Sequence, residues 1–192
     1  MASQAEANRV ARNRARGLLA AGLAIILLGI GAALLPARER ISSDLIAALL
    51  IAAGMIEAIA GSLRREARLL AIAAGCVTGL AGLLLILNPT THFFPNATLV
   101  VAWLFIRGAI LALAIRLTDG TVRVWTAISA GVDLLLALLL VAGLSIATVV
   151  ISLFGPTAPL VASFAWFLAA SFIANGVLLL EVSGCERQSA TS

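Results

Sequence analysis

The chain is poor in the residues that form a water-facing surface or a catalytic metal site. Its 192 residues include no Lys, no Tyr, one His and two Cys. A single histidine excludes a multi-histidine metal site, and Cys76 and Cys185 lie too far apart in predicted membrane depth for a disulfide or metal site. Cys76 falls in an apolar run, where a buried, hydrophobe-like role is expected. Charged residues make up only 11% of the chain, against roughly a quarter in a soluble domain, so it cannot cover itself with polar surface in water.

Hydrophobic residues make up 62% of the chain and lie in long runs. Residues 17–35 and 69–91 are uncharged, and Asp133 alone interrupts the run 124–180. Because about 20 apolar residues cross a bilayer core as a helix, the last run must hold two spans. Helices are favoured over strands because backbone polar groups in hydrocarbon must pair within the segment, and no alternating barrel pattern is present. We therefore predict an all-α integral membrane protein with spans at 17–36, 44–63, 69–88, 97–117, 124–144 and 158–181.

The net charge is +4, and all 13 basic residues are arginine. The arginines flank the spans, so we expect a lipid bilayer rather than nucleic acid as the partner. Ten lie in the N-terminal segment 1–16, the loops 64–68 and 116–123, and the tail 182–192, whereas two lie on the opposite side and one lies within a span. The positive-inside rule then predicts that both termini are cytoplasmic. The 19-residue apolar run that follows the first arginines exceeds a signal-peptide core, so we expect it to be retained as a helix.

Within the predicted membrane domain 17–181, a two-span unit recurs at about 17–65, 68–117 and 123–181. Glycine and proline recur in the first two units at offsets of 53 or 54 residues: Gly22 with Gly75, Gly29 with Gly82, Pro36 with Pro89, and Gly54 with Gly108. The third unit matches more loosely, through Gly131, Pro156 and Gly176, because about 11 extra residues precede the proline.

These residue types have physical roles in a membrane bundle. Glycine lets a neighbouring backbone come close, and Gly75 with Gly79 forms a small-xxx-small pair. Proline stops a helix where the chain must turn. Repeated units with two spans each enter the membrane in the same direction and are related by an axis along its normal. The pattern predicts three repeated helical hairpins in a pseudo-threefold six-helix bundle. The extra residues 143–160 should either lengthen the fifth helix or form an apolar segment at the membrane surface.

Three segments, "LLGIGAALLP", "GLAGLLLILNPTT" and "GPTAPLVASFAWFLAASFIANGV", resemble the HdeD-type acid-resistance membrane protein family. The resemblance covers about residues 16–181, and the third copy departs most, through its insertion and its lack of a second glycine before the proline. It implies a bacterial inner-membrane protein with six spans, associated in some members with survival of acid stress. It supplies no reaction, catalytic residue or cofactor.

Four polar residues within the predicted spans are the candidate functional residues: Glu57, Arg107, Asp133 and Asn175. A charge at the bilayer centre costs about 2.5–3.5 kcal/mol on insertion scales, so such residues face protein or water and pair with one another. Small residues around Glu57 and Asp133 predict tight helix interfaces. Two interpretations stay open: these charges line a proton or solute path, or they form an interhelical ion pair that fixes the bundle. His92, in a predicted loop, is either a pH sensor or simply solvated.

The sequence contains no enzyme motif. Its glycine-rich stretches lie in apolar helices rather than after strands, so they are not phosphate-binding loops. We expect a non-enzymatic membrane protein of acid or general stress resistance, without cofactor or metal. Two alternatives remain: a structural or assembly subunit of a larger membrane complex, and a small proton or solute transporter or channel. A membrane-protein partner or a homo-oligomer is compatible with either.

Overall fold

The computed structural model is an all-helical bundle, described here for residues 2–34, 43–87, 93–154 and 159–188. Six of its helices are long and apolar enough to cross a membrane, which confirms the predicted class. The elements are α1 (Ala2–Leu34), α2 (Ser43–Leu63), α3 (Arg68–Leu87), α4 (Phe93–Ala114), the short 3₁₀ helix η2 (Ile115–Leu117), α5 (Gly120–Phe154) and α6 (Pro159–Gln188).

Three helices, α1, α5 and α6, extend furthest beyond their predicted spans. Helix α1 begins at Ala2, and its early residues Ala11 and Ala15 are buried, so residues 2–16 of the basic N-terminal segment are part of the helix. Helix α6 likewise continues to Gln188. Hydropathy detects only the apolar part of a helix, whereas Ala, Arg and Gln also favour helix. Helix α5 continues to Phe154, so the extra residues of the third unit lengthen the fifth helix, the first of the two predicted alternatives.

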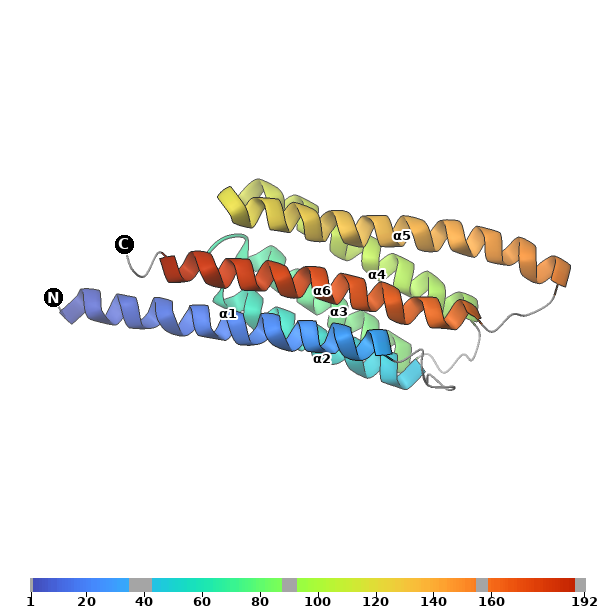
Figure 1. Ribbon diagram of the computed structural model, residues 1–192, viewed down its shortest axis with the longest axis horizontal. Coiled ribbons are helices and arrows are strands. Elements are labelled where there is room, and N and C mark those ends of the chain that lie inside the picture. The colour runs from blue at the N-terminus through green and yellow to red at the C-terminus, as the bar shows by residue number, and fades with distance from the viewer. Residues whose placement is uncertain (1, 35–42, 88–92, 155–158, 189–192) are drawn as a thin grey trace.

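The helices pack in a ring, and both termini lie at the same end of the bundle (Figure 1). The most extensive contacts are between α2 and α3, between α1 and α6, and between α4 and α5. Lesser contacts join α1 to α2, α3 to α4, and α5 to α6. The closest packing therefore lies between successive predicted units rather than within them, and the first and last helices close the ring.

Glycines make the α2–α3 interface close. A Cβ placed on Gly54 would lie 2.8 Å from the carbonyl oxygen of Gly75, and a Cβ on Gly75 would lie 2.9 Å from the carbonyl carbon of Glu57. Neither space admits a methyl group, so the two backbones are in direct contact here. Gly79 belongs to the same interface through its backbone, which faces Gly54. A Cβ placed on Gly79 itself would meet nothing within 4 Å.

Equivalent glycines bring α1 against α6. A Cβ on either Gly22 or Gly176 would lie 2.9 Å from the other's carbonyl oxygen. The α4–α5 interface differs, because Gly108 packs against the side chain of Leu134 rather than against the backbone of another glycine. Gly131 is exposed, and a Cβ there would meet nothing within 4 Å. The close approach predicted at Gly131 therefore does not occur, and the bulkier Leu134 contact replaces it. The other two predicted packing glycines also touch neighbouring helices, namely Gly29 and Gly82.

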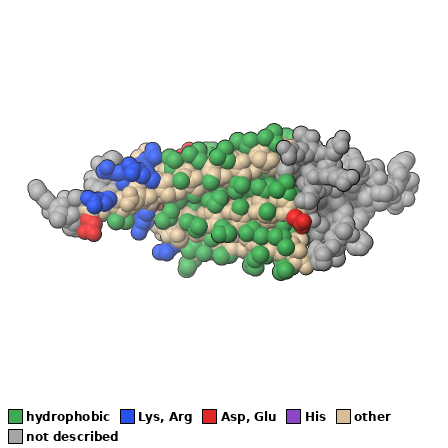
Figure 2. Space-filling view, turned by 90° about the horizontal axis from the view of Figure 1, so that it is seen from below, with side chains coloured by type: hydrophobic (Ala, Val, Ile, Leu, Met, Phe, Trp, Pro, Cys, Tyr) green, Lys and Arg blue, Asp and Glu red, His purple; other side chains and the backbone are tan. Residues whose placement is uncertain are grey.

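The surface divides into an apolar middle and a basic end (Figure 2). Hydrophobic side chains cover the middle of the bundle in this view, as expected of a surface that faces lipid. Many leucine and isoleucine side chains are exposed, for example Leu27 and Ile59. Arginine side chains gather at one end, called here the arginine-rich end. Cys76 is exposed on α3 rather than buried as predicted, because α3 turns its other face, with Gly75, toward α2. Four residues of the sequence argument lie outside the described residues: Pro36, Pro89, Pro156 and His92.

Candidate functional site

The three charged residues of the predicted spans meet inside the bundle. Arg107 of α4 lies between Glu57 of α2 and Asp133 of α5. Its Nη2 donates to Oε1 of Glu57 at 2.8 Å, its Nε donates to Oε2 at 3.4 Å, and its Nη1 donates to Oδ2 of Asp133. All three are buried, and Arg107 and Asp133 are fully inaccessible. One guanidinium therefore pairs with two carboxylates from different helices.

Two side chains of α6 complete the contacts of these charges. Ser171 accepts a hydrogen bond from Nη1 of Arg107 at 3.1 Å, and it donates to Oδ1 of Asp133 at 2.6 Å. Asn175 donates from Nδ2 to Oε1 of Glu57. Each carboxylate thus accepts hydrogen bonds from the arginine and from α6, which is the condition for a buried ion pair to be stable.

Helix α3 reaches the same cluster through a hydroxyl group. Thr78 Oγ1 lies 3.2 Å from Oε2 of Glu57 and 3.0 Å from the carbonyl oxygen of Ala74, so its one proton can go to either acceptor. The indole Nε1 of Trp103 donates to this oxygen at 3.1 Å. The Trp103 ring also packs edge-on against Phe172, with ring centroids 6.4 Å apart. These two buried rings flank the polar groups with apolar surface.

We call this set the ion cluster; it comprises Glu57, Thr78, Trp103, Arg107, Asp133, Ser171 and Asn175. It joins α2, α3, α4, α5 and α6 through side-chain hydrogen bonds. With both carboxylates ionised, its one guanidinium leaves a formal charge of −1. Uptake of one proton would make the cluster neutral.

No family model, curated protein or solved structure matches the chain. Within the described ranges, no three His, Cys, Asp or Glu side chains gather as a metal site would require. The charged groups of the cluster are one guanidinium and two carboxylates, which pair with one another and can bind protons.

The structure brings together all four polar residues that the sequence singled out. The small residues expected around Glu57, such as Ala53 and Ala60, are fully buried against neighbouring helices. Sequence reasoning missed three members of the cluster: Thr78, Trp103 and Ser171. Helical spacing contains a signal for two of them, because Trp103 precedes Arg107 by four residues and Ser171 precedes Asn175 by four. Residues so spaced share one helix face.

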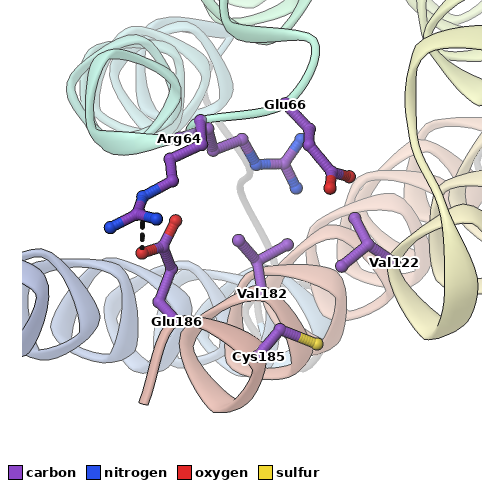
Figure 3. A pocket seen from close by; sticks show the side chains of 7 residues that line it. Arg64, Glu66, Val122, Val182, Cys185 and Glu186 are labelled. Carbon is purple, nitrogen blue, oxygen red and sulfur yellow. Dashed lines mark ion pairs between the residues drawn. The ribbon is translucent and has the colours of Figure 1, made fainter. Parts of the chain in front are cut away.

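A second polar feature lies between the ion cluster and the arginine-rich end. Arg64 follows the last residue of α2 and is only 6% exposed. It borders a small cleft of about 20 Å³ that also touches Glu57 and Asn175, room for about one water molecule. It also borders a larger pocket of about 190 Å³ whose walls include Glu66, Val182 and Glu186 (Figure 3).

Burial lowers the pKa of the Arg64 guanidinium to about 10, while the charges of Glu57 and Glu66 act in the opposite direction. Arg64 therefore stays positively charged at neutral pH. Among the described residues, its Nε and Nη2 have no hydrogen-bond partner. Its neighbour Arg65 is half-exposed and contacts Glu186, with Nε 3.3 Å from Oε2.

Proposed function

We propose that the chain is a non-enzymatic bacterial inner-membrane protein, similar to the HdeD family, that serves acid or general stress resistance. In this proposal the ion cluster is a lock that holds five helices in one arrangement. The observation that carries it is the shared guanidinium of Arg107, which pairs with Glu57 and Asp133 at the same time. The charges that join the helices are at most 5% exposed, so acid outside the membrane has little direct access to them.

A survival assay tests the stress role. A deletion strain should lose viability at acidic pH, and the wild-type gene should restore it. Arg107→Gln should fail to restore survival, because the lock is broken. Arg187→Gln, which changes an exposed arginine at the end of α6, serves as the matched control and should restore survival. Unaltered survival of the deletion strain across growth phases and acid strengths would refute the role.

A second candidate, a small proton or solute transporter, is favoured by the charge of the cluster. Two carboxylates share one arginine, and the small cleft touches Glu57. A transporter should show pH-driven flux in proteoliposomes that is lost in Glu57→Gln and Asp133→Asn. The exposed carboxylate of Asp44, on the same helix as Glu57, provides a control as Asp44→Asn. Absence of flux, or equal flux in all variants, excludes this function.

The proposed subunit role depends on a different region. We base it on the apolar residues 143–160, because such a surface can dock on lipid or on a partner protein. The side chains of residues 144–160 lie outside those described. Purification in mild detergent tests it directly, because a subunit should retain a partner at fixed stoichiometry. Recovery of the chain alone, or as a homo-oligomer, argues against it.

We propose further that both termini face the cytoplasm. The arginines at one end of the bundle support this orientation, because both chain ends lie at that end (Figures 1 and 2). Reporter fusions to each terminus test it. Fluorescence of a cytoplasm-dependent reporter at both ends is the expected result, and activity of a periplasm-dependent reporter at either end would contradict it.

The proposed pseudo-threefold repeat is supported by the alternation of packing around the ring. Extensive and lesser interfaces alternate, so each extensive interface joins the second helix of one unit to the first helix of the next. Repeat-equivalent glycines face each other across one of these interfaces as Gly22 and Gly176, and across another as Gly54 and Gly75. The third interface uses Gly108 with Leu134, which matches the looser sequence of the third unit.

A further inference from the structure

The pocket at the arginine-rich end contains a buried cation, Arg64, that has no ion-pair partner among the described residues. Arg64 is 6% exposed, it stays protonated at neutral pH, and it forms none of the ion pairs found among the described residues. Its Nε and Nη2 also lack hydrogen-bond acceptors within the described part of the chain. Desolvation of such a charge is offset only when acceptors satisfy its N–H groups. Glu57 and Glu66 act on this charge without a direct contact, so its N–H groups still require an acceptor, which an anionic oxygen would supply.

The same pocket also presents acidic groups. Oε2 of Glu186 accepts no hydrogen bond among the described residues, although Arg65 Nε lies 3.3 Å away. Glu66 lines the pocket as well and accepts a long hydrogen bond from the backbone N–H of Asp119. A purely anionic ligand would be repelled by these carboxylates. A ligand with one anionic and one cationic group would satisfy both kinds of wall (Figure 3).

The position of the pocket indicates where that ligand comes from. Arg64 follows immediately after Leu63, where the span of α2 ends, and further arginines gather at this end (Figure 2). This is the level of the lipid head groups, where basic side chains contact phosphate. The pocket volume of about 190 Å³ is compatible with a small head group, and Val122 and Val182 supply apolar wall.

We propose that this pocket binds a zwitterionic phosphate ester with a primary ammonium group, the head group of an aminophospholipid. The phosphate is held by the guanidinium of Arg64, whose planar fork matches phosphate oxygens. The ammonium group is held by Glu186 and faces Glu66. Arg64 already lines the pocket, so rotation of its side chain brings the fork to the phosphate. The site is separate from the ion cluster and does not depend on the proposed stress role.

Native mass spectrometry of the purified chain in detergent tests the site, with phosphatidylethanolamine and phosphatidylglycerol added in equal amounts. Wild type should retain phosphatidylethanolamine preferentially. Arg64→Gln should lose about tenfold in its retention, the loss expected for hydrogen bonds to a charged group. Arg68→Gln removes an exposed arginine at the same end that does not line the pocket, and it should bind like wild type.

Glu186→Gln gives a result that misfolding cannot imitate. It removes the contact to the ammonium group, so retention of phosphatidylglycerol should rise to equal that of phosphatidylethanolamine. Free phosphoethanolamine distinguishes the two sources of this chemistry: displacement of the lipid at equal concentration assigns the site to a soluble ester, and retention assigns it to the lipid. Equal binding of both lipids by wild type, or equal losses in Arg64→Gln and Arg68→Gln, would overturn the proposal.

Discussion

Replacement of Arg107 by glutamine should destabilise the bundle more than any other single change in the ion cluster. Arg107 is the shared partner of Glu57 and Asp133, and all three are buried. Without it, the two carboxylates keep only neutral donors, such as the amide of Asn175. Removal of one partner from a buried ion pair costs about 3–5 kcal/mol. Because Arg107→Gln breaks two pairs at once, we expect a loss of about 5 kcal/mol in the free energy of unfolding.

A charge-neutral variant isolates the cause of this loss. Glu57→Gln and Asp133→Asn, added to Arg107→Gln, replace every charge of the cluster by a neutral group of similar shape. Hydrogen bonds between neutral groups inside membrane proteins contribute about 0.6 kcal/mol each on average, and replacing all members of a buried ion set is often close to neutral. The triple variant should therefore recover most of the stability that the single variant loses.

Reversible unfolding by SDS in mixed micelles provides the measurement, followed by tryptophan fluorescence. Arg187→Gln, on the exposed end of α6, is the control and should change the free energy of unfolding by less than about 0.5 kcal/mol. The reasoning fails if Arg107→Gln costs less than about 1 kcal/mol, or if the triple variant is no more stable than the single one. Either result would show that charge pairing does not hold the five helices together.

Three further predictions concern packing and local conformation. Thr78→Val should cost about 1 kcal/mol in SDS unfolding because it removes the hydroxyl beside Glu57, and an unchanged midpoint would count against that contact. Gly54→Ala should cost about 1–3 kcal/mol, because its Cβ overlaps the α3 backbone. Gly131→Ala, in open space, should instead gain up to about 1 kcal/mol, so equal effects of the two alanines would refute the packing assignment. Ala67 has a positive φ of 48°, which glycine adopts without steric cost. Ala67→Gly should therefore increase the free energy of unfolding by about 0.5–1 kcal/mol and raise the melting temperature in detergent. A lower melting temperature would contradict this prediction.

Hydropathy was sufficient to predict six helices, because a segment that crosses the lipid must consist mostly of apolar residues. It could not place the start of α1 at Ala2, since the polar first turns are helical through helix propensity rather than hydropathy. The predicted packing role of Gly131 was also wrong, because it depends on more than the local sequence. A glycine in the repeat predicts close packing, yet whether a neighbouring backbone fills that space depends on the rotation of α5 within the ring.

The candidate site was partly predictable. A charge in a span must find a partner, so Glu57, Arg107 and Asp133 were visible in the sequence as a group. Arg64 was not, because an arginine just after a span is ordinarily a solvated topological signal. It is buried where the loop after α2 meets α5 and α6 at one pocket, and no local sequence pattern indicates such a meeting of distant segments. Thr78 was not predicted because a single hydroxyl group in an apolar helix can instead bond to its own backbone, and here its Oγ1 does lie 3.0 Å from the carbonyl oxygen of Ala74.

Closure of the ring by α1 and α6 has a consequence for biosynthesis. Helix α1 is synthesised before α6 but packs along it, so the glycine face of α1 lacks this partner until α6 has been made. Ser171 and Asn175, which bind Asp133 and Glu57, also arrive only with α6. A chain that stops before α6 therefore carries an open groove and two under-bonded carboxylates within the bilayer. Such a chain should therefore be less stable in the bilayer than one that contains α6.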